Sequence, residues 1–228
     1  MPVSRLFTSI RLHVFLACML GAIFFVGCSH SVALRDDHWQ NDIPPAAILL
    51  KKESRSLVER KEYSAAIVKL EESLKIHSNY YAATYNLALA YALRGFDPDN
   101  LSRNDSDRAK EFFEKALDIA KRNGLQDAEL HYAMSWFAFF QVVFWPPTPY
   151  ERGTWHTQYM NIEAMLKEAL RINSYHAPAL VLLGTVSELR GDLEQALIYY
   201  GQASDLHDEK GKEQFLRLKE INELIKNK

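Results

Sequence analysis

Residues 177–206 (APALVLLGTVSELRGDLEQALIYYGQASDL) carry the pattern that most restricts how this chain can fold. Gly184 lies inside a first apolar segment, and Gly191 and Asp192 separate that segment from a second one. The second segment places three core-forming side chains at positions i, i+4 and i+7, on one face of a helix: Ala196, Tyr200 and Ala203. Small residues let two helices approach closely, and large ones fill the space between them. The pattern predicts two antiparallel helices joined by a tight turn.

The same arrangement recurs, more irregularly, back to about residue 46. We expect first helices over residues 46–62, 80–95 and 127–145, and second helices over residues 63–76, 108–121 and 159–172. The corresponding triplets on the second helices are Ala66, Leu70 and Ser73; Ala109, Phe113 and Ala116; and Ile162, Leu166 and Ala169. Gly95 is expected to make the turn of the second hairpin, and Lys61 stands where the first hairpin would have its turn glycine.

This order and spacing resembles the tetratricopeptide repeat, a 34-residue helix–turn–helix unit. The resemblance covers residues 46–206 and is strongest in the second and fourth hairpins. It implies an all-α fold, a right-handed superhelical solenoid of about four repeats over residues 46–207. The amphipathic segment at residues 208–228 would then be a capping helix that seals the last repeat.

In this family the first helices of the repeats line a concave groove. Transferring those positions to this chain gives eleven candidate partner-binding residues: Tyr85, Asn86, Leu89, Leu93, His131, Tyr132, Ser135, Phe139, Val181, Leu182 and Thr185. The lining is aromatic and aliphatic with a few polar groups, which suits an extended or helical apolar peptide. Family members that clamp a C-terminal carboxylate add Lys and Arg to an Asn. Here only Asn86 matches, so a carboxylate clamp is not expected.

A run of aromatic residues in the third repeat is the least generic feature of the chain. Beyond the groove residue Phe139, it contains Phe137 and Phe140 and the candidates for a pocket or lid: Trp136, Phe144, Trp145, Tyr150 and Trp155. Two interpretations stay open. The rings form packed core together with a loop that covers a helix end, or they wall a pocket for a hydrophobic ligand.

The second repeat contains a polar insertion (FDPDNLSRNDSD, residues 96–107) with four aspartates. Calcium loops of the EF-hand type need oxygen ligands at positions 1, 3 and 5, a glycine at 6 and a glutamate at 12. Leu101 and Ser102 stand at positions 5 and 6, so we predict no metal site. We expect a polar loop that ends in a helix N-cap at Ser106 or Asp107.

The first 27 residues predict a leader peptide. Arg5 and Arg11 precede an uncharged apolar run over residues 14–26, which is shorter than the roughly 18–20 residues that span a bilayer. The run ends in Phe25-Val26-Gly27-Cys28, which resembles a bacterial lipobox. That resemblance implies cleavage before Cys28 and lipidation of its thiol; the alternative is an ordinary structural cysteine. Because Ser29 follows where the family's inner-membrane retention signal has Asp, the periplasmic face of the outer membrane is the expected location.

Residues 28–45 lack helical periodicity and are expected to form the lipidated N-terminus and a flexible tether. Cys18 lies inside the leader, so the mature chain would hold one thiol and no disulfide. Removal of residues 1–27 takes away two of 27 basic residues and none of 29 acidic ones, which leaves a net charge of −4. The charges are mixed along the sequence, so nucleic-acid binding is not expected.

The sequence contains no catalytic motif: no G-x-S-x-G, no H-E-x-x-H and no glycine-rich phosphate loop. We therefore expect a non-enzymatic protein without a cofactor. The first hypothesis is a membrane-anchored scaffold that holds a protein of an envelope assembly, such as pilus or secretin, outer-membrane or cell-wall machinery. The alternative is a ligand-binding accessory lipoprotein of a periplasmic uptake system, with its pocket in the third repeat. The sequence leaves the oligomeric state open.

Overall fold

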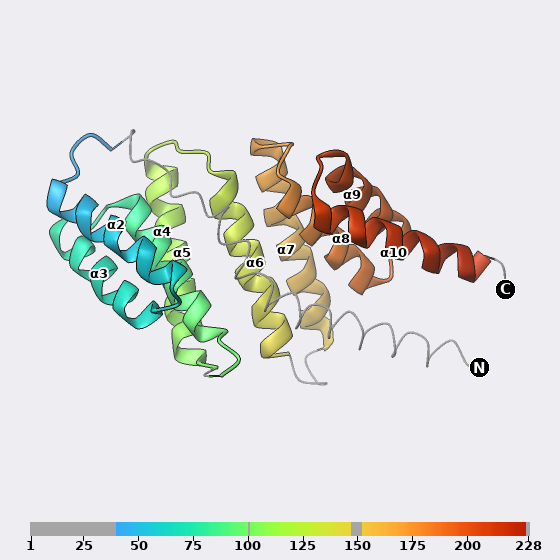
Figure 1. Ribbon diagram of the computed structural model, residues 1–228, viewed down its shortest axis with the longest axis horizontal. Helices are drawn as coiled ribbons and strands as arrows, with labels where there is room; N and C mark the ends of the chain where they lie inside the picture. Colours follow the sequence, from blue (N-terminus) through green and yellow to red (C-terminus); the bar gives the residue numbers. More distant parts are fainter. Residues whose placement is uncertain (1–39, 100, 147–151, 227–228) are drawn as a thin grey trace. The chain divides into compact units, whose positions relative to one another are not determined.

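A computed structural model of the chain describes residues 40–99, 101–146 and 152–226 (Figure 1). Nine α-helices account for most of these described residues, and none of them is assigned to a strand. The predicted all-α helical class is confirmed. The chain divides into two compact units at Phe144–Trp145. We call the described parts the N-terminal unit (residues 40–144) and the C-terminal unit (residues 145–226).

The N-terminal unit contains two helical hairpins and one further helix. The hairpins are α2 (Pro45–Glu59) with α3 (Tyr63–Ile76), and α4 (Tyr81–Gly95) with α5 (Arg103–Arg122); α6 (Ala128–Phe144) follows. Helix α4 packs against α5, α3 and α2, and α6 packs against α5 and α4. This stacking leaves α4 in the middle of the unit, with 13 of its 15 residues buried.

The C-terminal unit contains α7 (Arg152–Ile172), the hairpin of α8 (Ala177–Arg190) and α9 (Leu193–Asp205), and α10 (Glu209–Lys226). Helix α7 begins seven residues before the predicted start at residue 159. The two helices assigned to the third repeat, α6 and α7, therefore fall in different units. The capping segment forms the expected helix, which packs mainly on α9 and also touches α8.

The close approach of α8 and α9 explains the glycine inside the first segment of that hairpin. A Cβ atom on Gly184 would lie 2.5, 2.6 and 2.9 Å from three ring carbons of Tyr200. Any side chain would collide with the ring, as the small–large pattern predicted. Gly191 makes the turn at φ 86°, in the left-handed region that favours glycine. In the first hairpin, Lys61 adopts the same region at φ 62° without that advantage.

Gly95 has a different role from the one the sequence suggested. It is the last residue of α4 and has no positive φ, so the prediction that it makes the turn is wrong. A Cβ atom at this position would lie 3.1 Å from the Ser106 backbone nitrogen and 3.2 Å from the Asp105 Cβ. Glycine is needed because the end of α4 presses against the first turn of α5.

Helix α5 begins five residues earlier than expected, and its cap is neither Ser106 nor Asp107. The N-cap is Ser102, whose hydroxyl accepts a hydrogen bond from the Asp105 backbone N–H at 3.2 Å. The correction has an electrostatic reason. Asp105 enters the first turn of the helix and receives two hydrogen bonds, both 2.7 Å long, from the Arg94 guanidinium. An acidic residue in the first turn also stabilises the helix dipole.

No helix in the described part of the chain is both long enough and apolar enough to cross a bilayer. The leader at residues 1–27, the lipidation candidate Cys28 and most of the tether lie outside the described residues, and so does Tyr150. Predictions about these positions remain predictions.

Candidate partner-binding surface

Helix α4 carries four of the candidate groove residues. Tyr85, Asn86 and Leu89 are buried, with 7–8% of their surface exposed, and Leu93 is half-buried. Helical spacing places Asn86 beside Leu89 and Leu93 on one side of α4. The sequence identified these positions from the repeat pattern, and the structure brings them to the most buried helix of the N-terminal unit.

Asn86 is the polar exception on this helix. Its Nδ2 atom is fully buried and has no hydrogen-bond partner among the described residues. An amide N–H that loses water without gaining an acceptor costs about 1–3 kcal/mol. Thr84, by contrast, donates to the Tyr80 carbonyl at 2.9 Å, as buried hydroxyls on helices commonly do. The Asn86 amide is therefore a buried donor that the described fold does not use.

Aromatic contacts fix the Tyr85 ring. It stacks on the Tyr81 ring at a centroid distance of 6.4 Å and meets the Phe113 ring edge-on at 6.3 Å. The Tyr81 hydroxyl donates to an Asp127 carboxylate oxygen at 2.7 Å, which ties α4 to the residue just before α6. Tyr85 thus has a packing role inside the unit in addition to any role in binding.

Helix α6 carries the next candidates. His131 and Tyr132 are half-buried, whereas Ser135 and Phe139 are buried. The Ser135 hydroxyl donates to the His131 carbonyl one turn earlier, at 2.6 Å. These residues belong to the same unit as the α4 candidates, and α6 packs against α4.

The aromatic run of α6 converges on one residue outside that helix, Phe96. Its ring lies 5.5–5.9 Å, centroid to centroid, from four α6 rings: Trp136, Phe137, Phe140 and Phe144. Phe96 belongs to the segment that was expected to be a polar insertion, so its contact with α6 was not predicted. The described rings thus pack against one another. Trp145 is half-buried, and the side chain of Trp155 lies outside the described part, so the pocket-or-lid hypothesis stays a prediction.

Helix α8 holds the remaining candidates, Val181, Leu182 and Thr185. Val181 joins the hydrophobic cluster of the C-terminal unit, which also contains Tyr200 of α9 and Leu218 of α10. The Thr185 hydroxyl donates to the Val181 carbonyl at 3.0 Å and lies 3.2 Å from the Tyr200 hydroxyl oxygen. Two of the three candidates therefore contact the neighbouring helices of their own unit.

One turn beyond Thr185 lies a charged residue that the sequence analysis missed, Glu188. Only 2% of its side chain is exposed, and its Oε2 accepts hydrogen bonds from Arg217 at 2.6 Å and from the Tyr200 hydroxyl at 3.2 Å. Its Oε1 is buried without a partner among the described residues. Burial, and then the Glu188 charge, raise the pKa of the Tyr200 phenol far above its ordinary value. The available signal was the spacing: Glu188 follows Gly184 by four residues and Leu180 by eight, on the same side of the helix.

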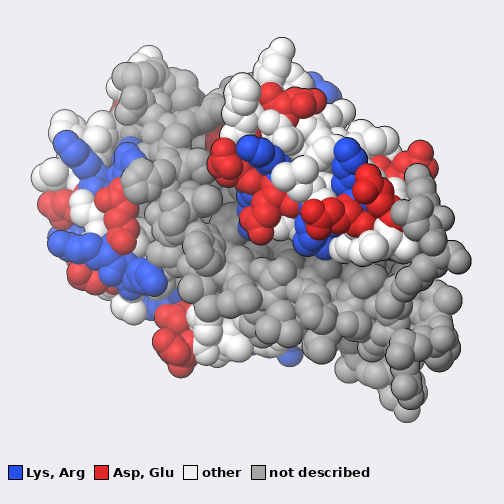
Figure 2. Space-filling view, turned by 45° about the vertical axis from the view of Figure 1, so that its right-hand side comes forward, with Lys and Arg blue, Asp and Glu red and all other residues white. Residues whose placement is uncertain are grey.

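The described residues form no metal cluster, and the described surface on the face in Figure 2 shows no region of single-sign charge. No group of three His, Cys, Asp or Glu side chains in the described residues could hold a metal ion. Figure 2 shows Lys and Arg interspersed with Asp and Glu on the described surface that it presents. In the N-terminal unit, a polar cleft of about 320 Å³ is lined by Gln40, Asp42, His77, Asn79, Ile119, Arg122 and Asn123. None of these is a groove candidate.

Solved structures of proteins called MamA are similar to this chain in fold. The MamA fragment from residue 41 to the end, from Desulfovibrio magneticus RS-1, is 18% identical, with a TM-score of 0.54, covering 79% of this chain and 97% of that one. A double mutant of the RS-1 protein is 17% identical, with a TM-score of 0.53 and coverage of 82% and 99%. Another MamA structure is 14% identical, with a TM-score of 0.52 and coverage of 77% and 87%.

These likenesses concern the fold. Together with the helical hairpins and the small–large contact at Gly184 and Tyr200, they confirm the tetratricopeptide-repeat type of architecture. In sequence, no protein-family model and no curated protein matches the chain.

Proposed function

We propose that this protein is a lipid-anchored scaffold that holds an apolar peptide segment of an envelope protein against α4 and α6. The observation that carries the proposal is the buried, unpaired amide donor of Asn86 on the helix where the repeat pattern places the groove. The tetratricopeptide-repeat fold supports it, because stacked helical hairpins of this kind provide extended surfaces for protein partners.

The chemistry of α4 selects the kind of partner. A peptide brings backbone carbonyl groups that need donors, and the Asn86 Nδ2 would donate to one of them once its side chain turns toward the partner. The neighbouring Leu89 and Leu93 offer apolar contact rather than charge, so side chains of the partner would be apolar too. In the fold without a partner, the buried donor costs stability; with a partner bound, that cost is removed.

The anchoring part of the proposal comes from the sequence. The lipobox-like end of the leader at Cys28 would leave the mature chain acylated, and a tether over residues 28–45 would connect the lipid to α2. Two or more acyl chains hold a protein on a membrane without a spanning helix. We place the protein at the periplasmic face of the outer membrane, where its partner belongs to an assembly of the envelope. The role is one of holding, with no catalytic step.

The substitution Asn86→Leu tests the binding part. Leucine has a similar volume and removes the unsatisfied donor, so the free energy of unfolding should stay equal or rise by up to about 1 kcal/mol. Capture of a stoichiometric partner from a detergent extract of the source cell envelope, by immobilised residues 29–228, should fall by about tenfold or more. Mass spectrometry identifies the partner.

Asn79→Ala is the matched control, because Asn79 is an exposed asparagine of the same unit. It should leave both stability and capture unchanged. If Asn86→Leu instead lowers the stability while capture persists, the amide has a structural partner and the groove assignment fails.

Anchoring is tested separately with Cys28→Ser. The variant should leave the membrane fraction, and metabolic labelling with a radioactive fatty acid should be lost. A variant that stays membrane-bound in high salt would show that residues 14–26 are an uncleaved anchor.

A further inference from the structure

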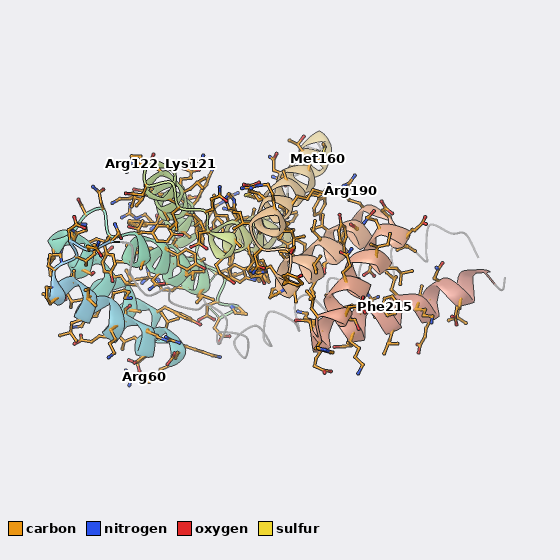
Figure 3. The ribbon with its side chains drawn as sticks, turned by 90° about the horizontal axis from the view of Figure 1, so that it is seen from above. Arg60, Lys121, Arg122, Met160, Arg190 and Phe215 are labelled. Atoms are coloured by element: carbon orange, nitrogen blue, oxygen red, sulfur yellow. The ribbon has the colours of Figure 1, made fainter. Side chains whose placement is uncertain are left out.

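The C-terminal helix α10 covers part of the α8 and α9 hairpin (Figure 1). Leu218 of α10 is 1% exposed and joins the cluster that contains Val181 and Tyr200. Phe215, labelled in Figure 3, lies over Gly201 of α9, where a Cβ atom would come 3.4 Å from the ring. Val181 is one of the residues that the repeat pattern assigns to partner binding. An internal helix thus packs into the cluster that includes part of the expected binding surface.

The polar contact between α10 and α8 is incomplete. Arg217 donates a single hydrogen bond to Glu188, from one Nη atom to Oε2, although a guanidinium and a carboxylate can form two parallel bonds. The second carboxylate oxygen, Oε1, is buried and has no partner in the described residues. A buried carboxylate oxygen without a donor is expensive, and Glu188 as a residue is 6% exposed. Helix α10 therefore supplies a hydrogen-bond donor to one carboxylate oxygen of Glu188 and none to the other.

The turn that leads into α10 is strained at one residue. His207 has φ 60°, in the left-handed region where residues other than glycine are disfavoured. Helix α10 itself begins well, because the Asp208 carboxylate accepts a hydrogen bond from the Gly211 backbone N–H at 2.7 Å. The helix is therefore capped independently of its docking, while the connection to α9 favours other conformations.

From these contacts we infer that α10 is a displaceable strap over the α8–α9 hairpin, and that a partner helix with an arginine on its apolar face takes its place at Glu188. The arginine of the partner donates to both carboxylate oxygens, and the apolar side chains replace Phe215 and Leu218. Release of α10 also lets His207 leave the left-handed region. The partner at this end of the chain is thus an amphipathic helix with a basic residue, which differs from the uncharged segment proposed for α4.

This inference concerns the C-terminal unit and can fail independently of the binding proposed for α4. Asn86→Leu acts in the other unit and should leave the behaviour of α10 unchanged. Conversely, changes at Arg217 and Glu188 should leave capture through α4 intact.

Native-state hydrogen exchange of residues 29–228 gives the first test. The amides of α10 should exchange about tenfold faster than those of α8 and α9, because a strap opens without unfolding the hairpin beneath it. Arg217→Met should accelerate exchange in α10 by a further factor of about ten, the effect of losing one charged hydrogen bond. Exchange in α10 as slow as in α8 and α9 would show a permanent part of the core and overturn the inference.

The second test supplies the strap in trans. A fluorescent peptide of residues 209–226 should bind the full mature chain with Arg217→Met about tenfold more tightly than the unchanged chain, as anisotropy measures. The same peptide with methionine at the position of Arg217 should lose that advantage. Equal binding of the two peptides, or no binding of either to the Arg217→Met chain, would show that Glu188 does not receive an arginine from outside. Circular dichroism confirms that the variant chain is folded.

Discussion

The hairpins α4–α5 and α8–α9 come from the same sequence pattern but are held together differently. In α8–α9, Gly184 admits the Tyr200 ring between the helices, and the ring hydroxyl reaches Glu188. In α4–α5, the corresponding positions are Ala88 and Phe113, and the ring contacts Tyr85 and Phe137 instead. A buried phenol hydroxyl needs a hydrogen-bond partner inside the hairpin, whereas a phenyl ring packs against other aromatic rings.

The glycines at the turns of the two hairpins also have different roles. Gly191 permits a left-handed turn with open space around it, so its value is conformational. Gly95 permits a close contact with the first turn of α5, which the Arg94–Asp105 ion pair holds in place. Equivalent glycines in a repeat therefore need not do the same work. Gly191 is required by its backbone conformation, and Gly95 by its close contact with neighbouring residues.

The largest difference between the units should appear on removing Phe96. Phe96→Ala deletes the ring that contacts four aromatic side chains of α6, and should lower the free energy of unfolding of the N-terminal unit by about 3–5 kcal/mol. Urea unfolding followed by circular dichroism measures the change. Phe96→Leu, which keeps most of the volume, should cost far less. Equal effects would mean that the ring contacts contribute little.

The α8–α9 contact should be the next most sensitive. Gly184→Ala places a methyl group within 2.5 Å of the Tyr200 ring and should destabilise the C-terminal unit by about 1–3 kcal/mol. Hydrogen exchange in α8 and α9 reports the loss locally. Ala88→Gly at the corresponding position of α4 is the counterpart, with a cost of about 1 kcal/mol from helix propensity. If Gly184→Ala is neutral, the two helices can separate without cost.

The stability of the two hairpins should depend differently on alkaline pH, because Tyr200 belongs to only one of them. Burial and the nearby Glu188 raise the pKa of its phenol, so the folded unit keeps a proton that the unfolded chain loses above about pH 10. The stability is complete below pH 10 and should fall by about 1.4 kcal/mol per pH unit above it. Tyr200→Phe should flatten this dependence in hydrogen exchange of α8 and α9. A slope unaffected by the substitution would assign the pH dependence to other titrating groups.

The smallest effects should come from the two left-handed turns. Gly191→Ala should destabilise its hairpin by about 1 kcal/mol, and Lys61→Gly should change the first hairpin in the opposite direction by a smaller amount. Lysine restricts the conformations of the unfolded chain more than glycine does. This restriction offsets part of the stability that glycine would add to the folded turn. Thermal unfolding of the single variants and the double variant checks the signs. A stabilising Gly191→Ala would contradict the conformational role of that glycine.

Much of the fold was predictable from residue spacing alone. The triplet of Ala196, Tyr200 and Ala203 is fully buried, as its position on one helix face required. Helix boundaries were less predictable where a polar insertion intervened. Residues 103–107 look like loop because they are polar, yet Ser102 caps them and Arg94 pairs with Asp105, so they extend α5. Asp105 lies eleven positions from its ion-pair partner Arg94, a separation that leaves no local periodicity to recognise.

The sequence by itself determined the helical hairpins and the chemical character of α4. Helical periodicity and the alternation of small and large residues are local properties, and they specify which faces must meet. Tertiary structure alone decided that Phe96 completes the aromatic cluster, that Asn86 has a buried donor left over, and that Glu188 lies beneath α10 with one oxygen unpaired. Whether a polar atom is satisfied depends on residues distant in the chain, because burial and hydrogen bonding are settled only when the elements pack.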